Sequence, residues 1–562
     1  MRNAVIIDSN HCPGSGDRIA ERLLALLQQS PSVGACRIEL VRPDAGLFDR
    51  GSADTAIYFP LLTEGKRQRP DLAEANEVLA ECARANVAKV VVISSAMVYG
   101  PKPQNPGFIS ESRPHSQNGR DWYGEMNSIA GAWIALEALA AEHLDWDGGK
   151  ALTLLRPTPV LRRCGADYFS RLFSGRLAVT LPGHDPSLQL LDPVDLARAI
   201  CCAVEGNSSG IYNVAADGVI PLRAALRLGG GRRVPLARWL QRLVRSPLAA
   251  DQLEYVRYSW TVSNARIRDE LGFAPARTTT EALLDFLGDR VPETRRAAEA
   301  FDAFGMDRDY IAAHGRTLFR FLQRYYWRIE VRGLEHVPRR GRAVLAGTHR
   351  GFMPWDAVMT FHLVVQGTAR YPRFLIHPTL VKFPFQFNFM TKLGGIIASR
   401  GNADRVLGED ELLGFYPEGI HGAFTFYREA YGLGKFGRNE FVRAALRNGA
   451  PIVPFVTVGS PEIFPIVGKI NWHWWKRLTQ WPFFPLAPPF PLLPLPLPSK
   501  WHTQFLEPLH LAEKYPPETA DDREVVNAIS QEVRDRMQAA VEAMLKRRKS
   551  IFFGSVFEGE PA

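Results

Sequence analysis

The chain has 562 residues and carries a formal net charge of +9, with 68 Lys and Arg against 59 Asp and Glu. This length predicts more than one domain, and the basic balance indicates an anionic partner such as a lipid headgroup, a nucleotide cofactor or an acyl carrier. The six cysteines all lie in the first 202 residues without a recurring CxxC pattern, which excludes a disulfide framework and a zinc site and indicates a reducing cytosol.

The first half of the chain alternates short apolar runs with helical segments. Strands are predicted at residues 4–8, 56–60, 89–94 and 151–155, and helices at 17–29, 72–86 and 123–143. The run KVVVIS at 89–94 is continuous in β-branched residues, as strands buried on both faces of a sheet usually are. This alternation predicts a doubly wound parallel sheet in a domain at residues 1–290.

Several motifs in this half occur in an order that is typical of one enzyme family. They are SSAMVYG at 94–100, YGEMN at 123–127, LLRPTPVL at 154–161, LLDPVDLARAI at 190–200, GIYNVAA at 210–216 and SNARIRDELGF at 263–273. On these motifs, residues 1–285 resemble the extended short-chain dehydrogenases, the NAD-dependent epimerase/dehydratase group. The resemblance implies a Rossmann-like fold and an NAD(P) site that includes Gly16, Ser95 and Tyr123.

Two parts of this NAD(P) site depart from the family's pattern. Asn10 and Pro13 replace two glycines of the phosphate-binding turn, and proline lacks the N–H that could meet a phosphate. Asn127 replaces the catalytic lysine, so no cation is present to lower the pKa of Tyr123. We therefore expect a degenerate domain with a structural, ligand-sensing or partner role. The alternative is a bifunctional enzyme whose N-terminal domain performs NAD(P)-dependent oxidoreductase or epimerase chemistry.

A second α/β domain is predicted at residues 317–562, after a charged, alanine-rich linker at 291–316. It begins with an amphipathic helix at 318–326 and with strands at 329–332 and Ala343–Gly347. His349 follows the second strand, and Asp356 lies just after Pro354, a residue that suits the first turn of a helix. The glycine-containing loop between them could let the carboxylate fold back onto His349.

A histidine beside a carboxylate suits acyl transfer to a hydroxyl. The imidazole removes the hydroxyl proton as the oxygen attacks a thioester, and the carboxylate fixes the tautomer and stabilises the cation. One His and one Asp at this spacing could equally be a histidine hydrogen-bonded at a helix start. The interpretation therefore depends on the motifs that follow.

Three further blocks follow in order: GGIIASR at 394–400, FYPEG at 415–419 and APIVPF at 450–455. Together with the His349 block they resemble the PlsC-like lysophospholipid/glycerol acyltransferases, over about residues 318–515. The first block, HRGFMPWD, has six residues between His and Asp where the familiar pattern has four. This spacing resembles the monoacylglycerol/diacylglycerol acyltransferase-like branch, as do residues 427–455 and 494–502.

The resemblance implies a role for each matching residue. His349 would be the general base and Asp356 the residue that orients it. Arg400 would bind an anionic part of a substrate, with a surface ion pair as the alternative. Glu418 and Gly419 would line the acceptor pocket, where Glu418 either meets a hydroxyl or orders the site, with a helix-capping carboxylate as the alternative. No metal or cofactor is needed, because the acceptor attacks acyl-CoA or acyl-carrier protein directly.

A lipid acceptor requires access to a bilayer. The chain start lacks a signal-peptide pattern and no uninterrupted apolar run reaches about 18 residues, so we expect a cytoplasmic protein, peripheral on the inner face of the cell membrane. The most apolar stretch, 481–498, is rich in proline and follows a tryptophan cluster at 472–475. It is interpreted either as an interfacial segment or as a cover over an acyl-chain tunnel. The basic tail at 545–550 could add attraction to anionic lipid.

The sequence thus predicts a Rossmann-like doubly wound sheet followed by an α/β acyltransferase domain of the phospholipid or glycerolipid type. The acyl group would move from acyl-CoA or acyl-carrier protein to a hydroxyl of a lysophospholipid, glycerol phosphate or acylglycerol. Nucleic-acid binding is not expected, because no recognised module accompanies the basic charge.

Overall fold

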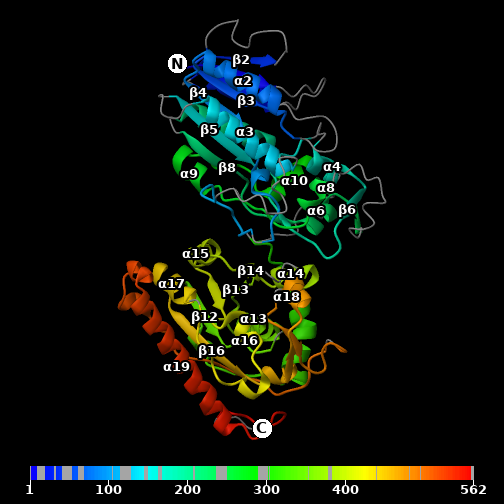
Figure 1. The fold of residues 1–562 in the computed structure, drawn as a ribbon, viewed down its shortest axis with the longest axis vertical. Helices are drawn as coiled ribbons and strands as arrows, with labels where there is room; N and C mark the ends of the chain where they lie inside the picture. The colour runs from blue at the N-terminus through cyan, green and yellow to red at the C-terminus, as the bar shows by residue number, and fades with distance from the viewer. Residues whose placement is uncertain are drawn as a thin grey trace. The chain divides into compact units, whose positions relative to one another are not determined.

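A computed structural model shows two compact units, Met1–Gly305 and Met306–Ala562, which are considered separately below (Figure 1). The structure describes residues 2–8, 19–30, 33–40, 53–60, 69–103, 105–113, 128–144, 150–162, 167–206, 209–235, 250–288, 302, 304–351, 353–377, 383–437, 439–479, 481–493 and 495–557. The second unit begins before the predicted start at 317. Asp307 donates its backbone N–H to the Lys392 carbonyl, and Tyr310 packs against Phe389, so this stretch belongs to the second unit.

The first unit is built on a six-stranded, fully parallel sheet. Its strands, in spatial order, are β2 (Val33–Leu40), β1 (Arg2–Asp8), β3 (Thr55–Phe59), β4 (Lys89–Ile93), β5 (Ala151–Pro157) and β8 (Gly210–Val214). The chain leaves β1 first toward one side and then toward the other. The predicted doubly wound, Rossmann-like fold is confirmed for this unit.

Helices cover both faces of this sheet. Helices α1 (Ile19–Gln29) and α5 (Pro193–Glu205) pack on one face, and α2 (Leu72–Arg84) and α3 (Ile129–His143) on the other. Successive strand residues point to opposite faces, so Val5 and Ile7 join one core cluster while Ala4 and Ile6 join the other. Burial on both faces explains why these strands read as continuous apolar runs.

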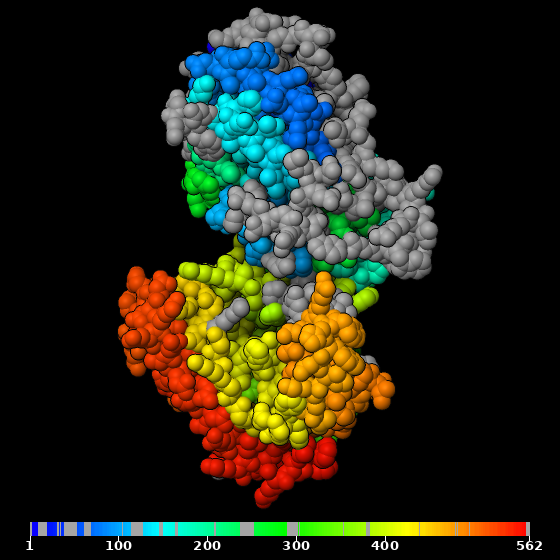
Figure 2. Space-filling model, viewed as in Figure 1, coloured from blue at the N-terminus to red at the C-terminus, as the bar shows by residue number. Residues whose placement is uncertain are grey.

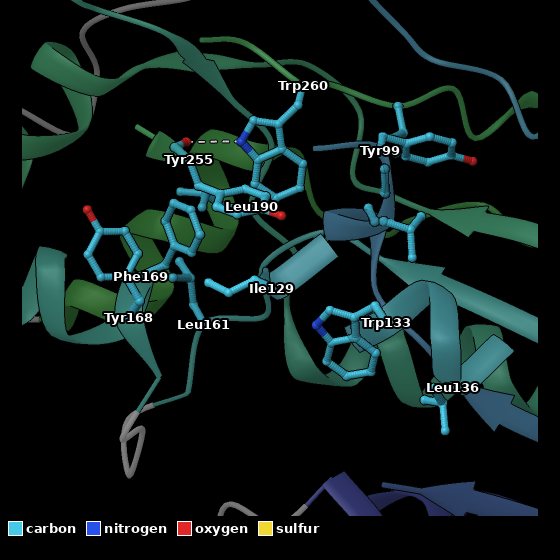
Figure 3. Close-up of a cluster of buried hydrophobic side chains, with 14 of the residues drawn as sticks. Tyr99, Ile129, Trp133, Leu136, Leu161, Tyr168, Phe169, Leu190, Tyr255 and Trp260 are labelled. Atoms are coloured by element: carbon cyan, nitrogen blue, oxygen red, sulfur yellow. Dashed lines mark hydrogen bonds between the residues drawn. The ribbon is translucent and has the colours of Figure 1, made fainter. Parts of the chain in front are cut away.

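The larger of these two clusters extends beyond the sheet into an aromatic region (Figure 3). There Trp260 donates its indole N–H to the Tyr255 carbonyl at 3.0 Å, and its ring lies 6.2 Å from that of Phe169. Buried Trp and Tyr side chains need partners for their polar atoms, and this bond supplies one for Trp260. The cluster fixes the segment after β5 against residues near 255–260.

The second unit contains a seven-stranded mixed sheet. In spatial order its strands are β11 (Glu330–Arg332), β19 (His502–Phe505), β16 (Ile452–Val458), β12 (Ala343–Gly347), β15 (Leu412–Phe415), β13 (Arg373–Ile376) and β14 (Ile396–Ile397). The last five in this order run parallel, and only β19 pairs antiparallel with β16. The carboxyl ends of those five strands therefore lie at one edge. The predicted α/β class is confirmed for this unit as well.

The main helices of the second unit connect and cover these strands. They are α13 (Trp355–Thr368), α14 (Pro384–Lys392), α15 (Arg400–Gly408), α17 (Glu440–Arg447) and α19 (Arg523–Arg547). Helix α19 runs along one flank of the unit, orange to red in Figures 1 and 2. Its buried residues recur every three or four positions, as in Val526, Ile529 and Val533, so a single stripe faces the core.

Candidate functional site

The candidate site lies at the carboxyl edge of the parallel strands in the second unit. His349 follows β12 by two residues, and Glu418 follows β15. These strands are neighbours, with Ala346 paired to Phe415. Ligands of open parallel sheets bind outside this edge. The sheet thus brings two of the predicted blocks together, although they are far apart in the sequence.

His349 and Asp356 form a direct hydrogen bond, with 2.8 Å between His349 Nδ1 and Asp356 Oδ2. The carboxylate is itself fixed, because Asp356 Oδ2 accepts the Arg350 backbone N–H at 2.9 Å and Oδ1 accepts the Ala357 N–H at 2.8 Å. Asp356 lies in the first turn of α13, where the helix dipole favours a negative charge. The side chain of Asp356 is 1% exposed, and that of His349 is 18% exposed.

This geometry assigns the roles of the two ring nitrogens. A carboxylate accepts but does not donate, so Nδ1 of His349 carries the proton that is shared with Asp356. Nε2 then carries the lone pair that a general base needs. The arrangement fits proton removal from a hydroxyl that approaches the partly exposed side of the ring.

Tyr416 packs against the His349 ring, with 4.7 Å between centroids and 34° between the ring planes. Burial raises the pKa of Tyr416 well above 10, and the nearby negative charge of Asp356 raises it further. The phenol therefore stays neutral over the working range of an enzyme. The Tyr416 ring therefore forms one wall of the site beside the imidazole.

Arg350 and Glu418 form the second element of the site. Arg350 Nη1 lies 2.7 Å from Glu418 Oε2, and Nη2 lies 2.9 Å from Oε1. Glu418 Oε1 also accepts the Gly434 N–H at 2.8 Å. Of the two roles predicted for Glu418, this geometry matches ordering of the site, because both carboxylate oxygens already have protein partners.

Sequence reasoning did not identify Arg350. Its guanidinium also donates to the carbonyls of Ala430, at 2.5 Å, and Gly432, at 3.1 Å. It thereby ties the His349 loop to the segment 430–434. The only signal in the sequence was its position directly after His349, and a charged residue there is more often solvent-exposed than part of a site.

Two glycines permit the close packing around the pair. A Cβ on Gly347 would overlap the Phe455 ring, and one on Gly422 would lie 2.9 Å from the His349 carbonyl oxygen. Gly419, the third residue predicted from the FYPEG block, has φ +57° with open space around it. It donates its N–H to the Tyr416 carbonyl at 2.8 Å, so its described role is in the turn from β15 into α16 (Gly419–Ala423).

Arg400 lies further from the pair than the other predicted residues. It begins α15, directly after the N-cap Ser399, and follows β14. β14 is three strands from β12 in the sheet, a separation of roughly 14 Å at the usual strand spacing. Its side chain is 66% exposed, with one Nε–Oδ2 distance of 3.6 Å to Asp404. It therefore faces solvent and does not contact His349.

The residues predicted for an NAD(P) site are only partly described. Gly16 and Tyr123, with Asn10, Pro13 and Asn127, lie outside the described residues. Ser95 caps the short 3₁₀ helix Ala96–Tyr99 and accepts the Met97 N–H at 3.2 Å. Nearby, Arg156 and Glu137 form a buried ion pair, with 2.6 Å between Nη2 and Oε2. This ion pair is a structural element of the core.

The apolar stretch 481–498 has a buried first part and an exposed later part. Its first part packs inward: Phe483 stacks on Phe426 at 5.9 Å and Phe484 is 9% exposed. Its later leucines are exposed, Leu492 by 91%. In the part of the chain that the structure describes, no helix is long and apolar enough to cross a bilayer.

Comparison with known proteins supports an acyl-transfer chemistry for the second unit. Residues 328–458 match the acyltransferase family. The chain is 36% identical over 262 residues to an uncharacterised protein of Mycobacterium tuberculosis, covering 45% of this chain and 72% of that protein. Phytyl ester synthase 2, chloroplastic, of Arabidopsis thaliana is 34% identical over 148 residues, covering 25% of this chain and 21% of that protein.

Solved structures similar to this chain include NAD complexes. MoeE5 in complex with UDP-glucuronic acid and NAD is 19% identical, with a TM-score of 0.39, and the match covers 53% of this chain and 100% of that chain. A UDP-galactose 4-epimerase is 18% identical, with a TM-score of 0.36, and the match covers 51% of this chain and 98% of that chain.

Proposed function

Because the chain belongs to the acyltransferase family through residues 328–458, we propose that it moves a fatty acyl group onto a hydroxyl of a glycerol-type lipid. The donor is acyl-CoA or acyl-carrier protein, and the acceptor is a lysophospholipid, glycerol phosphate or acylglycerol. The observation that carries this proposal is the His349–Asp356 hydrogen bond at the carboxyl edge of the sheet. The similarity to the plant phytyl ester synthase adds a long-chain alcohol to the acceptors worth testing.

In the proposed reaction, Nε2 of His349 takes the proton of the acceptor hydroxyl while its oxygen attacks the thioester carbonyl carbon. Collapse of the tetrahedral intermediate breaks the carbon–sulfur bond, and the thiolate receives the proton from the imidazolium. Asp356 stabilises the transient imidazolium through Nδ1. The products are an ester and a free thiol, so the step balances without a metal or redox cofactor.

The remaining residues have supporting roles in this proposal. Arg350 and Glu418 hold the His349 loop and the turn after β15 in fixed positions, since their bidentate pair is buried. Arg400, exposed at the same edge, meets a phosphate or another anionic group remote from the reacting carbonyl. Such remote binding energy helps to orient the donor or acceptor.

We place the protein in the cytoplasm, on the inner face of the cell membrane, where the acceptor lipid resides. For the first unit we propose a structural or ligand-sensing role, on the ground that proline and asparagine replace key residues of the NAD(P) pattern. Calorimetric titration of the whole chain with NAD(H) and NADP(H) tests this role. Tight binding would instead support the bifunctional alternative.

The deciding experiment is an acyl-transfer assay of the whole chain with acyl-CoA and acyl-carrier protein. The acceptor panel includes glycerol phosphate, lysophospholipids, mono- and diacylglycerols and a long-chain alcohol. We expect ester formation with at least one lipid acceptor and a loss on the order of 10³-fold for His349→Ala. Full activity in His349→Ala would rule out the mechanism, and no ester with any acceptor would rule out the function.

A further inference from the structure

Three segments of the second unit expose large apolar side chains. The first is a helical segment, 314–328, that presents Phe321 and Tyr325. The second is a proline-rich segment, 491–500, that presents Leu493 and Leu495, and the third is a tail segment, 545–554, that presents Phe552 and Phe553. These six side chains are between 44% and 72% exposed, although each is of a type that normally avoids water.

Hydrogen bonds join the three segments into one surface. Tyr326 donates its hydroxyl to the Pro496 carbonyl at 2.6 Å, and Trp327 donates its indole N–H to the Leu497 carbonyl at 3.2 Å. Arg328 Nη2 donates to the Phe552 carbonyl at 2.9 Å. The helical segment thus contacts both of the others. We call the exposed face of the three segments the apolar docking surface.

Most of the exposed charge of these three segments is positive, although Lys500 is paired with Glu330 and Arg548 with Glu462. None of the three segments contains Asp or Glu, whereas the helical segment carries Arg316, Arg320, Arg324 and Arg328, and the tail segment carries Lys546, Arg547 and Lys549 besides the buried, paired Arg548. Arg320 and Arg324 are exposed and lie beside Phe321 and Tyr325 in the sequence. Apolar and aromatic side chains beside arginines match the boundary between acyl chains and anionic headgroups.

The helical segment also has an unusual backbone. Residues Gly315–Phe319 and Leu322–Tyr326 adopt π-helical turns, which are uncommon and are frequent at functional sites. The expected amphipathic helix at 318–326 is therefore present, but its wider turns change which residues share a face. Phe319 and Leu322 are buried, while Phe321 and Tyr325 lie outward with 6.3 Å between their rings.

Ring contacts of Trp327 connect this surface to the candidate site. Trp327 follows the second π-helical turn, stacks on Trp501 at 4.5 Å, and meets the Trp355 ring at 5.7 Å in an edge-to-face contact. Trp355 directly precedes Asp356, the partner of His349. The docking surface thus packs, through Trp327 and Trp355, against the helix start that carries Asp356.

We propose that the apolar docking surface binds the headgroup–acyl boundary of an anionic lipid bilayer and so brings the acyltransferase site to its lipid acceptor. The surface goes beyond the proposed chemistry, because it binds membrane whether or not acyl transfer occurs. Phe552 and Phe553 insert with the two leucines, while the surrounding arginines and lysines contact lipid phosphates.

The test measures sedimentation of the whole chain with vesicles of phosphatidylcholine, with and without phosphatidylglycerol. We expect binding that is stronger with phosphatidylglycerol and weaker at high salt. The triple variant Leu493→Ser, Leu495→Ser, Phe553→Ser should weaken binding on the order of 100-fold, since three apolar side chains no longer enter the bilayer. Arg320→Gln with Arg324→Gln should weaken only the phosphatidylglycerol-dependent part, on the order of 10-fold.

A matched control comes from Phe385, which is 73% exposed on α14 against 72% for Phe553. Phe385→Ser should bind vesicles as the wild type does, and all variants should keep the wild-type thermal unfolding because the changed side chains are exposed. His349→Ala should bind vesicles normally, which separates failure of docking from failure of chemistry. The proposal is overturned if the wild type does not bind, if Phe385→Ser weakens binding as much as the triple variant does, or if the surface instead forms a dimer that the triple variant dissociates.

Discussion

Arg350 and Glu418 are joined by two N–O contacts of 2.7 and 2.9 Å, and their side chains are only 3% and 4% exposed. The pair links the loop after β12 to the turn after β15, and through the Gly434 N–H to a third segment. Two charges taken out of water are tolerated only because each is fully hydrogen-bonded. Neither side chain forms a hydrogen bond with the His349 ring. The pair therefore acts by holding the His349 loop and the turn after β15 in place.

Removal of one charge of this pair should be costly. Glu418→Gln leaves the Arg350 guanidinium buried without a countercharge, and we expect the free energy of unfolding of the second unit to fall by about 3–5 kcal/mol. Urea unfolding followed by tryptophan fluorescence measures this change. The double variant Arg350→Met, Glu418→Gln should lose less than the sum of the two single variants, because no unpaired charge remains. Strict additivity would contradict the ion pair.

Asp356→Asn tests the orientation of the base. The amide keeps the shape of the carboxylate but removes the negative charge that stabilises the imidazolium and selects the tautomer. We expect kcat to fall on the order of 10³-fold with little change in KM. Steady-state kinetics on the best acceptor from the panel gives both values. Asp404→Asn, a partly exposed carboxylate on α15, is the control and should keep wild-type kcat; a loss of less than about tenfold for Asp356→Asn would argue against the pair.

Gly347→Ala tests the close approach of β12 and β16. The added methyl would overlap the Phe455 ring, and overpacking of this kind costs about 1–3 kcal/mol of unfolding free energy. Phe455→Leu should partly restore stability in the same chain, since it removes the ring that the methyl meets. The control is Gly401→Ala on α15, where a Cβ has no neighbour within 4 Å. It should be neutral or stabilising by up to about 1 kcal/mol, because alanine favours a helix. Differential scanning calorimetry distinguishes the two glycines.

Stability of the second unit should fall in mild acid, in part through His362. Burial lowers the pKa of His362 to about 4, and its Nε2 lies 3.1 Å from Gln323 Oε1. An unfolded histidine has a pKa of about 6.5, so the unfolded state binds more protons between about pH 6.5 and pH 4. The folded state therefore keeps its full stability above this window and loses it as the pH falls through it.

The variant His362→Gln should flatten this dependence. We expect it to lose less unfolding free energy between neutral pH and about pH 4 than the wild type, by on the order of 1–2 kcal/mol. Burial also lowers the pKa of His502 to about 4, so part of the slope should remain. His473, which is exposed on α18 (His473–Thr479), supplies the control His473→Gln. Urea titrations over the acid range would contradict this account if both variants kept the wild-type slope.

Features of the fold and site that depend on neighbouring residues in the chain were predictable from the sequence. The strand Ala343–Gly347 and the helix start near Asp356 were predicted, because a buried apolar run and a proline at a helix start are local signals. The edge strand β2 (Val33–Leu40) was not predicted, since its sequence VGACRIEL mixes polar and apolar residues without a continuous apolar run. Edge strands have one neighbour and need less apolar surface.

Contacts between residues far apart in the chain could not be predicted from the sequence pattern. Arg350 and Glu418 are 68 positions apart, and only the sheet order places them together. The same limit applied to residues 481–498, where proline spacing gave no sign that Phe484 is buried while Leu493 is exposed. Substrate binding by Arg400 was predicted from its position in the motif. Its exposed side chain contacts no other predicted site residue, so this role stays a prediction.

Arg400→Gln gives that test. Its guanidinium is 66% exposed at the edge of the sheet that carries His349, and its only described ion pair is a distance of 3.6 Å to Asp404. A loose surface pair contributes little stability, so we expect thermal unfolding to change by less than about 0.5 kcal/mol in free energy. If Arg400 binds a phosphate of the donor or acceptor, KM for that substrate should rise on the order of 10-fold while kcat changes little. The effect should shrink at high salt.

Arg405 provides the matched control for Arg400, because it lies on the same helix and pairs with Glu409 at 3.1 Å. Arg405→Gln should leave both KM and kcat at wild-type values. Arg400→Lys should recover part of the affinity, since a lysine keeps the charge but cannot fork onto a phosphate. Equal KM values for Arg400→Gln and the wild type, with every donor and acceptor that reacts, would show that Arg400 forms only the surface ion pair. A rise in KM for one substrate alone identifies which substrate carries the anionic group that Arg400 binds.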